Sequence, residues 1–343
     1  MDLRNLQVIV HYGPAKVIFL ALFLCLFAVI LLKKRRGDYR SRSFYRNLYT
    51  ANIFELILFG WRTLGRPGSY VITRLIALGY AFTHPATIRS VRANMALLDP
   101  SRASFGAACR LLINQAECFS LYGFLAMKNP EEVMDMLGEK VGFDHLQQAH
   151  LGGKGCLLVT GHLGFFELGG LVMKQLGFPM TALTLPEPTS ELTEWRADFR
   201  GRWGVETIVV GDDHFSVVQI VRALNEGAFV ASLIDRPYDG TGTEVQLPHG
   251  KILFSTAPVL ISLLAKCPII PVGVTRQTDG RYRIEAHEAI QPSWMVEGRR
   301  ETLEFYTRKI AVALVPMFAQ EPEQWYHFCE LECGSQNGVA APR

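Results

Sequence analysis

The hydrophobic positions divide the chain into a helical first half and a second half in which strands and helices alternate. Between about residues 44 and 145, the runs Ile53–Trp61 and Tyr70–Phe82 are apolar and are separated by a break rich in glycine and proline. Apolar residues at helical spacing predict a further helix from Ser101 to Tyr122. The first two runs are too short or too broken to span a bilayer, and they fit either core helices or helices in a membrane interface. This half of the sequence predicts no strand.

Short β-rich runs begin near Gly152 and alternate with helical stretches. The expected strands are Cys156–Thr160, Thr181–Leu185, Thr207–Val210, Phe229–Ile234 and Ile269–Val274, with further candidates at Thr243–Leu247 and Tyr282–Ile290. The expected helices are Phe165–Leu176, Glu191–Trp203, Phe215–Asn225, Ala257–Lys266 and Glu301–Phe318. This alternation predicts an α/β fold with a largely parallel sheet that is covered on both faces.

The N-terminus carries a candidate membrane anchor, Val17–Leu32, which is uncharged throughout. As a helix it is about 24 Å long, slightly short of a hydrocarbon core, and Lys16 and Lys33 can extend outward to the headgroups. A cleaved signal peptide is the alternative, but a dense basic cluster follows directly and no small-residue cleavage site is present there. Two basic residues precede the segment and seven follow it closely, which predicts a single-pass membrane protein with its body in the cytoplasm.

Charge and composition narrow the function classes. The formal net charge is +3, yet residues 33–46 alone carry +6 and residues 47–343 sum to −4. The positive charge is therefore local, which argues against a nucleic-acid-binding body and for a collar beside anionic headgroups. Hydrophobic residues make up 49% of the chain, enough for a sizeable core. We divide the chain into an anchor with its basic flank (1–36), a helical membrane-proximal region (37–148), an α/β core (149–334) and a flexible tail (335–343).

Seven scattered cysteines, mostly in apolar runs, fit buried reduced thiols better than a disulfide framework. Cys329 and Cys333 lie near His327 and resemble metal ligands, but no second ligand pair accompanies them. We predict no metal and no cofactor.

The most informative segment is Thr160–Gly170, TGHLGFFELGG, where a buried strand ends and a helix begins within a few residues. His162 and Glu167 are five positions apart, so on one continuous helix they would point about 140° apart. They can meet only if His162 lies on the loop and Glu167 in the first turns of the helix. Such a pair suits general-base catalysis, in which a carboxylate orients the imidazole and the imidazole takes a proton from a hydroxyl. The same spacing also occurs by chance in surface and capping residues.

Several segments in order resemble the bacterial lipid A late acyltransferases, the lauroyl/myristoyl transferase family that also includes mycobacterial mannoside acyltransferases. TGHLGFFELGG resembles the family's H-x4-[DE] block, and Asp235–Pro237 (DRP) is similar to its acidic–Arg–Pro stretch. Further similar segments are VRANMALL at Val91–Leu98, Ser255–Pro258 with the following helix and IIPVGVTR, and PEQW at Pro322–Trp325.

The resemblance implies a glycerolipid-acyltransferase-like mixed sheet with flanking helices, preceded by a transmembrane helix and a helical region. It also implies that the membrane is the cell inner membrane. It implies His162 as general base with Glu167 as its partner. A lipid hydroxyl would attack a thioester carried on acyl carrier protein or coenzyme A, with the oxyanion held by backbone N–H groups near the start of the 164–176 helix.

Four further residues are expected to bind substrate. Arg236 would hold a phosphate or the substrate with Asp235 orienting it, although a structural ion pair at a strand end is an equal alternative. Arg92 and Asn94 would line the acceptor groove or tie helices together.

The acceptor is expected to be a lipid A precursor or a related glycolipid. Few aromatic and basic residues surround the DRP stretch, so an ornithine-type lipid, a polyene lipid or a lysophospholipid is the alternative. An esterase would be expected to carry a G-x-S-x-G elbow, which the sequence lacks. A non-catalytic membrane scaffold would be expected to have lost His162 or Glu167, and both are present.

Overall fold

The computed structural model describes residues 51–211, 215–237 and 240–331. The candidate anchor at 17–32, the basic cluster at 33–46 and the tail after 334 lie outside the described residues. Among the helices that are described, none is both long and apolar enough to cross a membrane.

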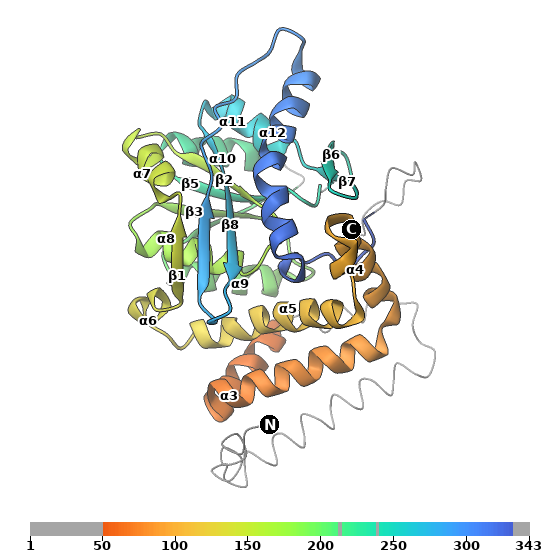
Figure 1. Cartoon of the computed structure of the whole chain (residues 1–343). Coiled ribbons are helices and arrows are strands. Elements are labelled where there is room, and N and C mark those ends of the chain that lie inside the picture. Colours follow the sequence, from red (N-terminus) through yellow and green to blue (C-terminus); the bar gives the residue numbers. More distant parts are fainter. Residues whose placement is uncertain (1–50, 212–214, 238–239, 332–343) are drawn as a thin grey trace.

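The first part of the described chain is helical, as expected. It comprises α3 (Ala51–Thr83), α4 (Pro85–Leu98), the short 3-10 helix η3 (Pro100–Arg102), α5 (Phe105–Leu125) and α6 (Pro130–Met134). The backbone of α3 breaks at Gly65, whose φ of 64° is readily available only to glycine, and Pro67 follows directly. Two helical segments therefore meet there at a bend. α3 packs along α5, and α5 lies between α3 and the sheet (Figure 1).

The second part forms a seven-stranded mixed sheet in the order β1-β9-β8-β2-β5-β3-β4 (Figure 1). Its strands are β1 (Leu137–Val141), β2 (Cys156–Thr160), β3 (Met180–Thr184), β4 (Glu206–Val209), β5 (Phe229–Leu233), β8 (Ile269–Arg276) and β9 (Tyr282–Ala286). β8, β2, β5, β3 and β4 are parallel, whereas β9 pairs antiparallel with β8. The expected α/β fold with a mixed sheet and flanking helices is confirmed.

Helices cover both faces of this sheet. They are α7 (Phe143–Leu151), α8 (Phe166–Gln175), α9 (Ser190–Arg202), α10 (Phe215–Asn225), α11 (Ala257–Ala265) and α12 (Arg299–Gln320). Alternate residues of β2 point to opposite faces, so Leu158 joins the core beneath α7, α8 and α9 while Leu157 and Val159 join the core beneath α10, α11 and α12. All five residues of β2 are buried, which explains its uninterrupted apolar sequence.

Two strands depart from the expectations. β1 lies in the region expected to be wholly helical, and it pairs parallel with β9. Its sequence LGEKV is half-exposed at the sheet edge and has no apolar periodicity to reveal it. The expected strand Thr243–Leu247 exists as β6, but it forms a separate antiparallel hairpin with β7 (Gly250–Phe254) and not part of the main sheet. The proposed domain boundary at residue 148 stays a prediction.

Candidate active site

The strand register brings His162 and Asp235 together. β2 and β5 are parallel neighbours in which Thr160 is paired with Leu233. Each of the two site residues follows its strand by two positions, so they emerge side by side at the carboxyl edge of the sheet. A backbone hydrogen bond from Ile234 N to Thr160 O, 2.9 Å long, extends the pairing to the last residue before the site. The carboxyl edge of parallel strands is where α/β sheets place their active sites.

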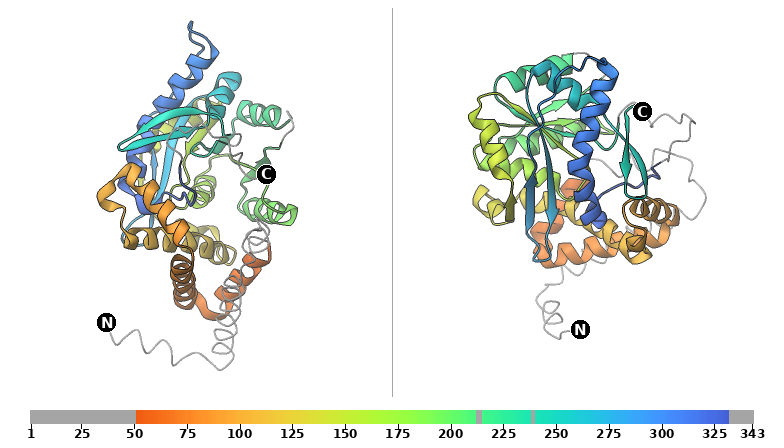
Figure 2. Two further views of the ribbon diagram at one scale, coloured as in Figure 1. Left: turned by 90° about the vertical axis from the view of Figure 1, so that its right-hand side faces the viewer. Right: turned by 45° about the horizontal axis from the view of Figure 1, so that its top comes forward.

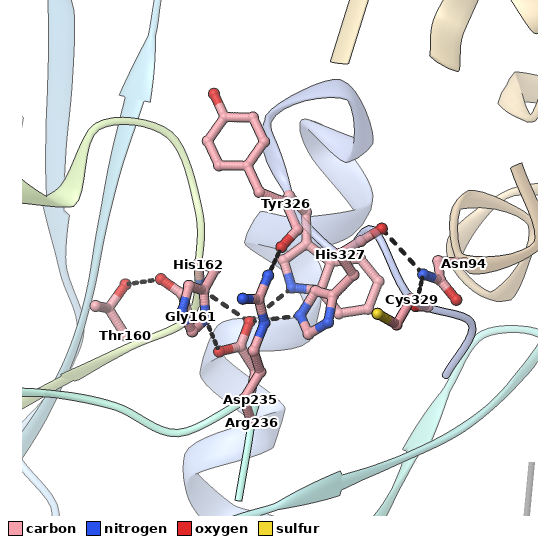
Figure 3. A network of polar contacts seen from close by, with 10 residues as sticks. Asn94, Thr160, Gly161, His162, Asp235, Arg236, Tyr326, His327 and Cys329 are labelled. Carbon is pink, nitrogen blue, oxygen red and sulfur yellow. Dashed lines mark hydrogen bonds and ion pairs between the residues drawn. The ribbon is translucent and has the colours of Figure 1, made fainter. Parts of the chain in front are cut away.

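The carboxylate of Asp235 accepts four hydrogen bonds and is fully enclosed (Figure 3). Oδ1 accepts from His162 Nδ1 at 2.7 Å, and Oδ2 accepts from the backbone N–H of His162 at 2.8 Å. Oδ2 also accepts from Trp325 Nε1 at 3.0 Å and from His327 Nε2 at 2.9 Å. Four donors leave the carboxylate no freedom to turn, so it fixes the orientation of the His162 ring.

The electrostatics keep Asp235 ionised. Burial by itself raises the pKa of Asp235, but the attraction and hydrogen bonds of His162 and His327 outweigh burial and hold that pKa well below its usual range. Burial lowers the pKa of His327 despite the neighbouring carboxylate, so its ring is neutral near pH 7 and Nε2 carries the shared proton. His162 donates through Nδ1, and about a fifth of its side chain is exposed. Its Nε2 is left available to accept a proton from a substrate.

A C-terminal segment completes the site. After α12 and the 3-10 helix η4 (Pro322–Gln324), the chain returns to the carboxyl edge of the sheet. Tyr326 N donates to His162 O at 2.8 Å, and Gly164 N donates to Gln324 O at 2.7 Å. The side-chain amide of Gln324 accepts a hydrogen bond from the backbone N–H of Arg276, at the end of β8, and donates one to the carbonyl of the same residue. Helix α5 holds the same segment through Arg110 and Asn114, which bind the side chain and the carbonyl of Glu323 respectively.

Glycines allow the loop between β2 and α8 to approach its neighbours. Gly164 has a φ of 56°, and a Cβ there would lie 1.8 Å from the carbonyl oxygen of Val274. A Cβ on Gly161 would lie 2.5 Å from the ring of Phe318 and 2.8 Å from Asp235 Oδ2. Neither position has room for a larger residue, because Gly161 packs against Phe318 and Asp235 and Gly164 packs against the backbone of β8.

The expected pairing of His162 with Glu167 is wrong. Glu167 lies in the first turn of α8 and forms a bidentate ion pair with Arg200 of α9, in which Arg200 Nε lies 3.0 Å from Glu167 Oε2. Both side chains are buried. Burial raises the pKa of Glu167, but Arg200 outweighs burial and the net shift is downward. The local spacing suggested a partner within the motif, whereas the parallel register supplied one from another strand.

The other sequence-predicted site residues have structural partners. Arg236 does not pair with Asp235; it is exposed and its guanidinium donates to the carbonyl of Tyr326 (Figure 3). Asn94 is buried on α4, where it donates to the carbonyls of His327 and Cys329 and accepts from Leu331 N. These bonds use both side-chain N–H groups and one acceptor position of Oδ1, so Asn94 ties α4 to the C-terminal segment.

Arg92 is exposed on α4 and donates from Nε to Ala103 O at 2.9 Å, which fastens the turn around η3. Of the two interpretations left open for Arg92 and Asn94, the geometry favours tying elements together.

Sequence reasoning did not assign Trp325 or Arg200 to the site, and it considered His327 only as a neighbour of two candidate metal-ligating cysteines. PEQW marked the neighbourhood of the first two, but nothing local in the sequence assigns the Trp325 and His327 side chains to a carboxylate 90 residues away. Arg200 is one of several basic residues on α9, and only its burial distinguishes it.

A metal is a second possible use of the cluster. His162, Asp235 and His327 each offer a ligand atom, and these atoms lie within 4.8 Å of one another. Hydrogen bonds of 2.7 and 2.9 Å already join the two histidines to Asp235. His162 Nδ1 and His327 Nε2 therefore have partners without a metal ion. The other candidate ligand, Cys329, is exposed, and Cys333 lies outside the described residues.

An apolar cavity adjoins the site on the sheet face covered by α7, α8 and α9. Its walls come mainly from α8 and from alternate residues of the central strands, including Leu158, Ala182 and Val272. Glu167 and Arg200 also line it, as does Phe166, whose ring centroid lies 6.0 Å from that of His162. Phe166 therefore contacts both the cavity and the catalytic candidate.

A comparison with known families identifies the family of the chain. The chain matches the bacterial lipid A biosynthesis acyltransferase family over residues 45–331, and it belongs to that family. It is therefore an acyltransferase, an enzyme that uses an acyl donor and a lipid acceptor of the lipid A type. No curated protein matches the chain.

Proposed function

We propose that this enzyme transfers a fatty acyl chain from a thioester on acyl carrier protein or coenzyme A to a hydroxyl of a lipid A precursor or a related glycolipid, with His162 as general base. The observation that carries the proposal is the bond between Asp235 Oδ1 and His162 Nδ1, which leaves Nε2 of His162 as the proton acceptor. Asp235 takes the role that the sequence assigned to Glu167.

The reaction follows from this geometry. As the acceptor oxygen attacks the thioester carbonyl carbon, its proton moves to Nε2 of His162, and the ionised Asp235 stabilises the resulting imidazolium. A carbon–oxygen bond forms and the carbonyl becomes a tetrahedral oxyanion. When the carbon–sulfur bond breaks, the leaving thiolate takes the proton back from Nε2. The products are an ester and a free thiol, and the cycle uses no cofactor.

The oxyanion needs hydrogen-bond donors near His162. Two backbone N–H groups of the loop are already engaged, because Gly164 donates to Gln324 and Phe165 donates to Val274. The N–H groups of Phe166 and Glu167, at the first two positions of α8, have no carbonyl partner within their own helix. We assign the oxyanion to these two donors, where the helix dipole also favours negative charge.

The apolar cavity is the proposed place for the acyl chain. It is lined mainly by apolar side chains and begins at Phe166, beside the imidazole. The buried pair of Glu167 and Arg200 braces α8 against α9 at its wall. In this proposal Glu167 shapes the chain-binding cavity and positions the start of α8, and it does not touch the reacting proton.

Substrate location agrees with the proposal. Lipid acceptors lie in a bilayer, whereas acyl thioesters are soluble in the cytosol. A predicted anchor at 17–32, a basic collar at 33–46 and a catalytic body on the cytoplasmic side would join the two.

The test is acyl transfer by the full chain in detergent, with radiolabelled acyl-carrier-protein and coenzyme A thioesters. The acceptors are Kdo-lipid A, a lysophospholipid and an ornithine-type lipid. His162→Ala is compared with His145→Ala, a matched control on α7 that lies outside the site. Label that enters one acceptor and is lost only in His162→Ala is the expected result. Equal transfer by both variants would rule out His162 as the base, and transfer only to a non-glycolipid would overturn the acceptor class.

A further inference from the structure

The outer side of α3 carries an apolar stripe that has no partner within the described residues. Val71, Leu75 and Phe82 recur at helical spacing and are 57%, 48% and 72% exposed. The opposite side of the same helix is buried against α5 through Trp61, Ala77 and other residues.

A second helix extends this stripe. Phe105, at the start of α5, is 46% exposed, and its ring centroid lies 5.9 Å from that of Phe82. We call Val71, Leu75, Phe82 and Phe105 the outer stripe. Contiguous exposed apolar side chains of this kind mark an interaction surface, because a helix that faces only water is normally polar on that side.

The charge around the outer stripe identifies the kind of partner. Between residues 57 and 116 the sequence holds seven arginines and one acidic residue, Asp99. Asp99 is occupied by bonds from Ser101. Apart from its N-terminal 46 residues, the protein has a net charge of −4, so this concentration of arginine is specific to α3, α4 and the start of α5.

Several of these arginines are available to a partner. Arg62, Arg66 and Arg89 are exposed and form no ion pair with any residue that the structure describes. The guanidinium of Arg66 also lies over the rings of Tyr70 and Phe124, 5.6 and 6.0 Å from their centroids. Arg74 and Arg110 pair with Glu117 and Glu323, both outside the arginine-rich stretch. Apolar side chains interleaved with arginines on exposed helices are the pattern of a surface that lies in an anionic bilayer interface.

The position of α3 fits that partner. It lies at one end of the molecule, beyond the carboxyl edge of the sheet where His162 lies, and the start of α12 lies at the opposite end (Figure 2). α3 is also the first described element after the predicted anchor at 17–32. No described helix can cross a membrane, so α3 would lie in the plane of the interface.

We propose that the outer stripe and the arginines of α3 and α4 dock the catalytic body flat on an anionic lipid surface. This goes beyond the acyl transfer, because it concerns how the body sits on the bilayer and not the reaction. It also chooses between the two interpretations that the sequence left open for the apolar runs of the first half. Docking would set the carboxyl edge of the sheet toward the bilayer that holds the acceptor.

Photocrosslinking of the full chain in nanodiscs tests the proposal. A benzophenone amino acid replaces Leu75 or Phe82 in turn, and matched controls carry it at Val296 and Phe305, two exposed apolar positions near the start of α12. The bilayer is phosphatidylethanolamine with or without phosphatidylglycerol. Several-fold more lipid adduct at 75 and 82 than at 296 and 305, with the excess dependent on phosphatidylglycerol, is the expected result.

Other partners of the outer stripe would give different crosslinked products. Adducts from 75 or 82 to residues 17–32, to a second copy of the chain or to added acyl carrier protein, in place of lipid, would overturn the proposal. Equal lipid adducts in neutral bilayers would overturn the role of the arginines.

A charge-reversal set provides an independent test. Each arginine near an anionic surface contributes about a factor of five in binding, so changing Arg62, Arg66 and Arg89 to Glu should shift docking by at least about a hundred-fold. The control set is Arg299, Arg300 and Arg308 to Glu, on α12. Lipid adducts that persist in the first set would refute the proposal.

Acyl transfer assayed in detergent separates this inference from the proposed function. If lipid adducts are lost while acyl transfer stays intact, only the docking proposal is refuted. If lipid adducts form but no acceptor is acylated, only the proposed reaction is refuted.

Discussion

Replacing Asp235 by asparagine removes the negative charge beside His162 and leaves the side chain almost the same size. In the wild type, two carboxylate oxygens accept four hydrogen bonds, from the side chains of His162, His327 and Trp325 and from the backbone of His162. An asparagine keeps one acceptor oxygen and directs an NH2 group toward at least one of those donors.

The expected loss is large because two effects combine. The imidazole loses the acceptor that holds its Nδ1 proton, so the reactive tautomer is no longer enforced. Removal of the carboxylate from a comparable carboxylate–imidazole pair lowers kcat by about 10⁴-fold. Each lost hydrogen bond to a charged group also removes about 1.5–3 kcal/mol of interaction. We expect kcat to fall by about 10³- to 10⁴-fold with a smaller change in KM.

The assay is initial-rate acyl transfer by purified Asp235→Asn, with Asp144→Asn on the exposed side of α7 as the matched control. Circular dichroism and thermal unfolding of each variant serve as the control for folding. Activity within about tenfold of the wild type, with His162→Ala inactive, would refute the assignment of Asp235 as the partner of His162. A folded but inactive Glu167→Gln variant beside an active Asp235→Asn variant would restore the original pairing.

Three further outcomes test the surrounding structure. Glu167→Gln leaves Arg200 buried without its partner, so the free energy of unfolding should fall by about 3–5 kcal/mol; unchanged urea unfolding would contradict this. Gly164→Ala places a Cβ 1.8 Å from Val274 O, and the displaced loop should lower kcat about a hundred-fold; wild-type kcat would show that the loop tolerates the change. The pKa of His327 is lowered in the folded state, so the unfolded state binds more protons below about pH 6.5 and stability falls as pH decreases. His327→Gln should therefore flatten the decline in melting temperature between about pH 7 and pH 5. An unchanged decline would show that protonation of His327 does not cause it.

The local pattern of the sequence was sufficient for most elements. Buried strands such as Cys156–Thr160 are short apolar runs because both faces are covered, and that pattern needs no tertiary information. The break in α3 followed from Gly65 and Pro67, which disfavour a continuous helix for reasons internal to the chain. β1 was missed because an exposed edge strand has no apolar alternation to detect.

For the candidate site, the sequence predicted one residue and the structure supplied its partner. His162 was predictable, because a histidine that follows a buried strand lies at the carboxyl edge wherever that strand falls in the sheet. Its partner was not, because β3 and β4 lie between β2 and β5 in the chain, and only the folded order makes β5 the neighbour of β2. The spacing of five residues favoured Glu167, whereas the parallel register of Thr160 with Leu233 brought Asp235 to the imidazole.

The sequence by itself determined the fold class, the position of the proposed general base His162 and the family segments, because these depend on residues close together in the chain. The tertiary structure alone decided which carboxylate serves His162, that Glu167 binds Arg200, and that His327 and Trp325 enclose Asp235. Those contacts join segments that are 33 to 92 positions apart, and their geometry is set by strand order and by the path of the chain after α12. No local pattern of residues encodes the strand order or the path of the chain after α12.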